Sequence, residues 1–188
     1  MEYIILTNTF RRSIDLVERS LKSSLNQKIE PRKVILIDQN DPPLKLSKEL
    51  KENPLLEIQY VNTKSVSIAR NLAKKPACDW YVFCDDDGYM KEDYSEILDK
   101  IISTNNHIDI VAGSIIRDDN FEFYSIRHAI GGNPNQFRFT KLLMGSNFAV
   151  REKVFHDLGG FDDEFGVGSK WGSGEETDFA WKVYFNKI

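Results

Sequence analysis

Short, uninterrupted apolar runs separated by helical patterns constrain the fold of this chain most strongly. Residues 34–37 and Trp80–Cys84 are continuous apolar segments, as expected for strands buried on both faces. Such strands occur in parallel sheets, whose crossover connections are helices that cover the two faces. After Ser13, apolar residues recur at helical spacing at Ile14, Val17, Leu21 and Leu25. The pattern predicts an α/β fold with a mostly parallel central sheet flanked by helices.

The remaining elements follow the same reasoning. Apolar runs predict further strands at residues 3–7, 58–61, 108–116 and 147–150. Helical patterns predict helices at residues 65–73, 92–103, 152–158 and from Glu175 to the last residue. In the helix at 92–103, the expected buried stripe is Ile97, Leu98, Ile101 and Ile102. Residues 131–135 predict a turn, and the Gly/Ser-rich residues 166–174 predict a loop.

Composition excludes several classes of protein. The chain has 188 residues, enough for one domain over residues 1–188, and 41% are apolar, which excludes intrinsic disorder. The net charge of −4 argues against a nucleic-acid partner. The two cysteines and three histidines have no zinc-ligand spacing. No apolar stretch approaches the length of a membrane span, so we expect a cytoplasmic domain.

The distribution of glycine limits how phosphate can be bound. The first glycine is Gly88, so the first half has no glycine-rich phosphate loop. Ligands of open α/β sheets bind at the carboxyl ends of strands, where this chain places acidic residues. Asp85 and Asp87 share one side if the strand stays extended, and with phosphate oxygens they suit Mg²⁺ or Mn²⁺. The competing interpretation is a solvated acidic turn.

Three other features also allow two interpretations. Asp38 follows a buried strand, and it either contacts a ligand or caps the turn after it. Arg70 either clamps phosphate or covers the surface. The acidic residues of the last helix either cap its first turn or supply a general base, with Trp171 in the preceding loop delivering an acceptor hydroxyl. These acidic residues are Glu175, Glu176 and Asp178.

Six motifs together resemble family 2 glycosyltransferases of the GT-A fold, which transfer sugars from nucleotide donors with inversion. The resemblance runs from about residue 3 to 187. The motifs, in order, are IILTNTFRR, VILIDQND, SVSIARNLA, YVFCDDDGYMKEDY, MGSNFAVREKVFHDLGGFDDEF and GEETDF. Two positions depart from the family pattern. Gln39 stands where many members have a second Asp, and Glu176 replaces the usual Asp of the last motif.

The resemblance implies a role for each motif. Residues 1–104 would form a Rossmann-like donor half, and residues 105–188 an acceptor half truncated at its C-terminus. In the donor half, the nucleotide-binding residues would be Thr9, Phe10, Asp38, Arg70, Asp85 and Asp86. The metal, Mn²⁺ or Mg²⁺, would be held by Asp87 with Asp85. The base would be Glu176, with Glu175 or Asp178 as substitutes, and Trp171 and Asn147 would lie on the acceptor side.

The same resemblance implies the partners and the setting. The donor would be a nucleotide-diphospho-sugar, most often a UDP-sugar. The acceptor would be a glycan, a lipid-linked molecule or another hydroxyl compound. The setting would be bacterial surface polysaccharide or glycoconjugate synthesis, with the full-length protein peripheral to the membrane.

Two alternatives from other classes remain. Residues 85–89, DDDGY, nearly match the D-x-D-G-T motif of haloacid-dehalogenase-type phosphohydrolases, in which Asp85 and Asp87 would carry the chemistry. The second alternative is a nucleotide-sugar binding module without catalytic activity.

Overall fold

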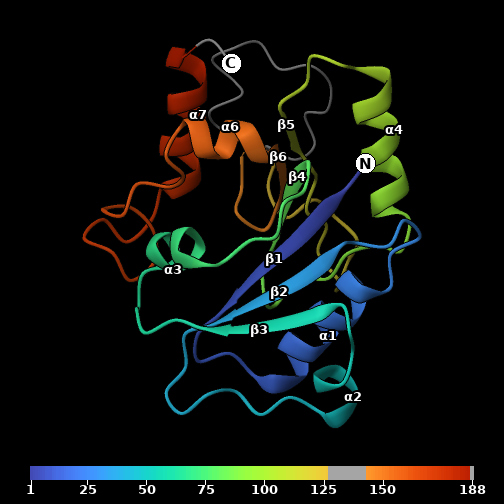
Figure 1. The fold of residues 1–188 in the computed structure, drawn as a ribbon, viewed down its shortest axis with the longest axis vertical. Coiled ribbons are helices and arrows are strands. Elements are labelled where there is room, and N and C mark those ends of the chain that lie inside the picture. The colour runs from blue at the N-terminus through green and yellow to red at the C-terminus, as the bar shows by residue number, and fades with distance from the viewer. Residues whose placement is uncertain (127–142, 187–188) are drawn as a thin grey trace.

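The computed structural model describes residues 1–126 and 143–186 and shows a sheet with helices on both faces (Figure 1). The strands are β1 (Tyr3–Thr9), β2 (Lys33–Asp38), β3 (Leu56–Tyr60), β4 (Trp80–Cys84), β5 (Ile110–Ala112) and β6 (Asn147–Arg151). The helices are α1 (Ile14–Leu25), α2 (Lys48–Lys51), α3 (Val66–Leu72), α4 (Tyr94–Thr104), α6 (Glu152–Asp157) and α7 (Glu175–Asn186). The α/β class predicted from the apolar runs is therefore confirmed.

The strand order creates the place where a ligand can bind. The order is β3-β2-β1-β4-β6-β5, with parallel pairing from β3 to β4 and antiparallel pairing of β6 with β4 and β5. The chain moves outward from β1 to β3 and then returns to the other side of β1 as β4. The strand order therefore reverses between β1 and β4, and ligands of open α/β sheets bind at the carboxyl ends of the strands at such a point. The acidic residues 85–87 follow β4 at this edge.

Two apolar layers hold the helices against the sheet. On one face, α1, α2 and α4 contribute Val17, Leu21, Leu50 and Leu98 to the core. On the other face, α3, α6 and α7 contribute Ala69, Phe155, Phe179 and Ala180. Figure 1 shows these two groups of helices on opposite sides of the strands. The first turn of α7 is therefore fixed by the burial of Phe179 and Ala180, which directly follow its acidic residues.

Several predicted elements differ in detail from the structure. The strand predicted at 108–116 is only Ile110–Ala112, and Ile116 instead forms an isolated bridge with Phe123. Ile97 was expected in the buried stripe of α4 but is exposed, because Ser95, Leu98 and Ile102 share the helical face toward the sheet. The predicted turn at 131–135 and the end of the last helix at 187–188 lie outside the described residues.

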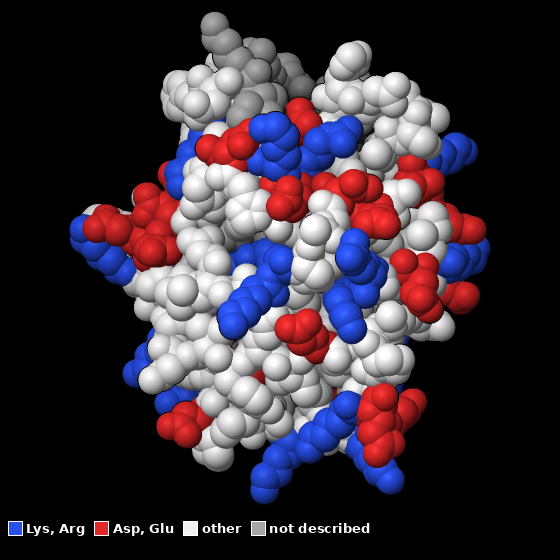
Figure 2. All heavy atoms as spheres, in the orientation of Figure 1, with Lys and Arg blue, Asp and Glu red and all other residues white. Residues whose placement is uncertain are grey.

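The surface carries both signs of charge. Figure 2 shows Lys and Arg interspersed with Asp and Glu across the face in view. None of the described helices combines the length and the apolarity needed to cross a membrane.

Candidate active site

The carboxyl edge of the sheet brings together side chains from four elements. Arg70 of α3 lies within ion-pair distance of Asp85 after β4 and of Glu175 and Glu176 at the start of α7. The β4–β6 ladder places Asn147 opposite Cys84, one residue before Asp85. Residues separated by as many as 106 positions in the sequence thus meet at one edge.

Arg70 is the centre of this arrangement. Its side chain is 4% exposed, and its guanidinium lies 3.5 Å from Glu176, 3.6 Å from Asp85 and 3.9 Å from Glu175. Its Nε donates to Asn8 of β1 at 3.2 Å. Arg70 was predicted to contact nucleotide phosphate. In the structure it contacts protein carboxylates, where a planar donor with five N–H groups can serve several acceptors at once, and the contact with phosphate stays a prediction.

Two aromatic rings keep this cation away from water. The guanidinium carbon of Arg70 lies 5.4 Å from the ring centroids of Phe83 and of Phe161, within the range of cation–π attraction. The low polarity of these rings strengthens the interaction between the guanidinium and its carboxylates.

Glu176 has the protonation behaviour of a general base. Burial raises the pKa of Glu176 to about 7; Arg70 opposes this rise and Glu175 adds to it. The helix dipole at the first turn of α7 also favours an ionised carboxylate, yet the loss of hydration outweighs it. A carboxylate that titrates near neutral pH accepts a proton efficiently at that pH.

Gly145 determines where the Glu176 carboxylate lies. A Cβ on Gly145 would overlap Oε1 of Glu176 and would stand 3.2 Å from Nη1 of Arg70. Only glycine leaves room for the carboxylate here. The motif that begins at Met144 belongs to the expected acceptor half, but its Gly145 was not predicted as a site residue.

We therefore expect Gly145→Ala to displace the Glu176 carboxylate and to lower turnover about 10- to 100-fold, because a displacement near 1 Å has effects of this size. Steady-state kinetics with the preferred donor would measure it. Gly172→Ala is the matched control, because a Cβ on Gly172 would meet nothing within 4 Å. Equal turnover of both variants would contradict the placement of Glu176.

Asp86 and Asp87, the two aspartates that follow Asp85, contact a different cation, Arg12. Arg12 lies between β1 and α1, and its Nε is 3.0 Å from Oδ1 of Asp86. Its Nη2 is 3.0 Å from Oδ2 of Asp87. Arg19 of α1 donates to the carbonyl oxygen of Asp87 at 3.0 Å, which fixes the backbone at that residue. Asp85 therefore faces Arg70, whereas Asp86 and Asp87 face Arg12, because the chain turns at residues 86–87 instead of continuing as the extended strand on which the prediction depended.

The chemistry of Asp85 and Asp87 fits a divalent cation that the substrate helps to hold. Both side chains are partly exposed and offer the hard oxygen ligands that Mg²⁺ and Mn²⁺ prefer. Within residues 1–126 and 143–186, no group of three or more His, Cys, Asp or Glu side chains is arranged to hold a metal. Mg²⁺ commonly binds through one or two carboxylates plus substrate phosphates, and these two residues are compatible with that mode.

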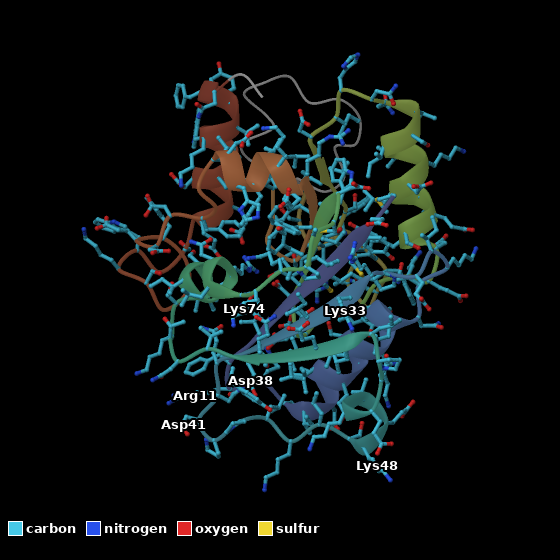
Figure 3. The ribbon with its side chains drawn as sticks, viewed as in Figure 1. Arg11, Lys33, Asp38, Asp41, Lys48 and Lys74 are labelled. Atoms are coloured by element: carbon cyan, nitrogen blue, oxygen red, sulfur yellow. The ribbon has the colours of Figure 1, made fainter. Side chains whose placement is uncertain are left out.

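Asp38 lies at the same end of the sheet but has its oxygens occupied. Oδ1 of Asp38 accepts from the backbone and side-chain nitrogens of Asn40 at 2.9 and 2.7 Å, and Oδ2 accepts from the backbone of Leu44 at 2.7 Å. Figure 3 shows Asp38 and Arg11 together at this end and Lys33 at the opposite end of β2. Asp38 thus caps the turn that follows β2, and its contact with a nucleotide stays a prediction.

Gln39 links this corner to the buried arginine. Its amide nitrogen donates to the carbonyl oxygens of Thr63 and Ser65 at 2.9 and 3.2 Å, and its oxygen accepts from Asn8 at 3.2 Å. Asn8 in turn accepts from Arg70. A carboxylate at position 39 has no hydrogen to donate to these carbonyls, so the departure to Gln39 has a structural reason. Asn8 was missed because a polar residue inside a strand gives no signal in the sequence.

The remaining predicted residues are placed as follows. Thr9 is buried at the end of β1, and half-buried Phe10 packs against Arg11, 5.1 Å from centroid to guanidinium carbon. Asp178 pairs with Lys182 on α7 at 3.1 Å instead of with Arg70. Nδ2 of Asn147 donates to the carbonyl of Ser114 at 2.9 Å.

The loop at residues 166–174 is attached to α3. Val66 donates its N–H to the carbonyl of Val167 at 3.0 Å, and the hydroxyls of Ser65 and Ser169 are 2.6 Å apart. A Cβ on Gly168, whose φ is +81°, would overlap the carbonyl oxygen of Lys64. Trp171 is exposed in the second half of the loop, and its backbone N–H donates to the carbonyl of Glu164 at 2.8 Å.

Comparison with known proteins identifies the family. Residues 4–159 match the family described as Glycosyl transferase family 2, which is more than half of the chain. The chain belongs to glycosyl transferase family 2. Membership in this glycosyltransferase family favours a transferase over the phosphohydrolase alternative. No curated protein matches the chain by sequence.

Solved structures confirm the GT-A fold of this family 2 domain. Residues 1–349 of TarS from S. aureus superpose with a TM-score of 0.73 at 19% identity, covering 99% of this chain and 56% of that one. The same TarS fragment in complex with UDP gives 0.72 at 18% identity, covering 99% and 56%. The mannosyltransferase PcManGT from Pyrobaculum calidifontis, in complex with GDP-Man and Mn²⁺, gives 0.68 at 16% identity, covering 97% and 51%. This family 2 chain thus spans about half the length of these structures.

Proposed function

We propose that this family 2 domain transfers a sugar from a nucleoside-diphosphate donor to an acceptor hydroxyl with inversion at the anomeric carbon. One observation carries the proposal: Arg70 joins Asp85, at the end of a strand, to Glu176, a partly buried carboxylate whose pKa is raised to about 7. A single displacement requires a base for the acceptor hydroxyl and positive charge to stabilise the leaving diphosphate, which Glu176 and a metal on Asp85 would supply. TarS has been solved with UDP and PcManGT with GDP-Man, so we propose a UDP-sugar donor with a GDP-sugar as the alternative.

Each residue of the site would have its own role in this reaction. A divalent cation, when bound, would stabilise the negative charge that develops on the leaving diphosphate. Asp85 and Asp87 would hold it. Glu176 would accept the proton of the acceptor hydroxyl as its oxygen attacks the anomeric carbon, and the bond to the diphosphate would break on the opposite side. Arg70 keeps the Glu176 carboxylate in place. We propose that Trp171 and Asn147 contact the acceptor.

The first test is a titration of UDP, GDP, CDP and dTDP onto the protein, with Mn²⁺, with Mg²⁺ and with EDTA. The proposal expects one nucleotide to bind only with metal. The expected donor residues lie within the described part of the chain, so failure of all four to bind to the folded protein would overturn the proposed donor site.

We expect Asp87→Ala to remove metal-dependent binding of that nucleotide, with an affinity at least about tenfold lower, because a charge-assisted contact is worth about 1.5–3 kcal/mol. Isothermal titration calorimetry with Mn²⁺ and with EDTA measures the effect. Asp157→Ala is the control: it removes the same charge from an exposed residue paired with Lys153 on α6. Retained metal dependence in Asp87→Ala would exclude Asp87 as a ligand.

A further inference from the structure

We propose that Arg12 is an exchangeable counterion of this site. In the structure Arg12 binds Asp86 and Asp87. When a metal occupies Asp87, the Arg12 guanidinium transfers to the diphosphate of the donor. This inference rests on the proposed function, since it requires a metal and a diphosphate at this edge.

The geometry shows one guanidinium spanning two adjacent carboxylates. Nε of Arg12 is 3.0 Å from Asp86, and Nη2 is 3.0 Å from Asp87. A divalent cation that binds the same oxygen of Asp87, Oδ2, would meet the positive charge of Arg12 at close range. Two cations near 4–5 Å repel strongly at the edge of a protein. Metal binding at Asp87 therefore has to displace at least the Nη2 arm.

The two carboxylates differ in a way that makes this exchange possible. The side chain of Asp86 is 8% exposed, whereas those of Asp87 and Arg12 are 44% and 42% exposed. Asp86 is thus the fixed end of the bridge, and Asp87 is the open end. Because Arg19 holds the Asp87 backbone through its carbonyl, the exchange needs only side-chain rotation. Side chains with this exposure rotate on the picosecond to nanosecond timescale.

The diphosphate of the donor would be the new partner of Arg12 at this edge once Arg12 no longer contacts Asp87. The first half of the chain has no glycine-rich loop, so backbone N–H groups of that kind cannot cradle phosphate. Arg70 is buried and already serves three carboxylates. Arg12 is half exposed beside the metal ligands, and a guanidinium matches phosphate oxygens in a two-pronged contact.

Arg12→Gln tests the exchange with two separate readouts. Electron paramagnetic resonance of free Mn²⁺ measures metal binding without nucleotide, and calorimetry measures UDP binding at saturating Mn²⁺. We expect Mn²⁺ alone to bind about fivefold tighter in the variant, the size of a lost surface ion pair. We expect UDP to bind about tenfold weaker, because a charge-assisted phosphate contact is lost.

The control is Arg32→Gln, which removes the same charge from an exposed arginine paired with Glu2. Arg32 directly precedes β2, at the opposite end of the sheet, and its removal should change neither affinity. Equal Mn²⁺ binding by Arg12→Gln and wild type, or none by either, would overturn the competition. Unchanged UDP affinity would overturn the transfer to diphosphate. If the wild-type protein bound no nucleotide with metal, the proposed function itself would fail.

Discussion

Glu176→Gln should abolish sugar transfer while leaving donor binding intact. The amide keeps the shape of the side chain and can still accept a hydrogen bond from Arg70, but it cannot take the proton of an acceptor hydroxyl. General base catalysis contributes about 10²–10⁴-fold, so turnover should fall by at least about 100-fold. Release of nucleoside diphosphate from the donor measures turnover, and calorimetry measures binding.

The same substitution should stabilise the fold, which separates loss of the base from damage to the structure. The pKa of Glu176 is raised from its ordinary value of 4.5 to about 7, so between these values the folded state binds more protons than the unfolded state. Stability is therefore lost as the pH rises through this window. Removing the carboxyl should increase the free energy of unfolding by about 1–3 kcal/mol at pH 8, with a small effect near pH 4. Urea denaturation at both pH values checks this.

Two neighbours in the first turn of α7 provide the controls. Asp178→Asn removes a carboxylate that pairs with Lys182, and it should retain transfer. Glu175→Gln removes the other α7 carboxylate near Arg70, and it should lower the pH at which turnover reaches half its maximum, since Glu175 raises the pKa of Glu176. Normal turnover by Glu176→Gln would exclude it as the base and leave Glu175 as the next candidate.

Local patterns in the sequence predicted the fold, and they predicted the carboxyl edge of the sheet as the place of the candidate site. Continuous apolar runs indicate buried parallel strands, and their carboxyl ends place Asp38 and Asp85 at one edge of the sheet. Glu176 reaches this edge from the start of α7, which the strand pattern does not determine. The pattern did not predict the partners, because contacts between distant residues leave no local signal. No local pattern indicated that Arg70 pairs with a carboxylate of α7, which follows 106 residues later. Arg12 and Asp86 meet in the same way across 74 residues.

Arg70→Met should cost more stability than any other single change at this edge. The substitution removes the cation that Asp85, Glu175 and Glu176 share and leaves carboxylates at a poorly hydrated site. Breaking a buried ion pair by removing one partner costs about 3–5 kcal/mol. The loss should be smaller near pH 4, where the carboxylates can be protonated in both states, and should grow as the pH rises past the pKa of Glu176. Urea denaturation across this range measures it, with Arg32→Met as the surface control.

The double variant Arg70→Met/Glu176→Gln shows whether Arg70→Met loses stability through electrostatics or through packing. If the stability is lost because negative charges are left without a partner, then Glu176→Gln should stabilise Arg70→Met at pH 8 by more than it stabilises the wild type. The two changes should then depart from additivity by about 1–3 kcal/mol, the range for residues in direct contact. Strict additivity would mean that Arg70 stabilises the fold through its contacts with Phe83 and Phe161 instead.

Because Arg70 lowers the pKa of Glu176, a folded Arg70→Lys variant with weaker pairing should also reach half-maximal turnover at a higher pH than the wild type.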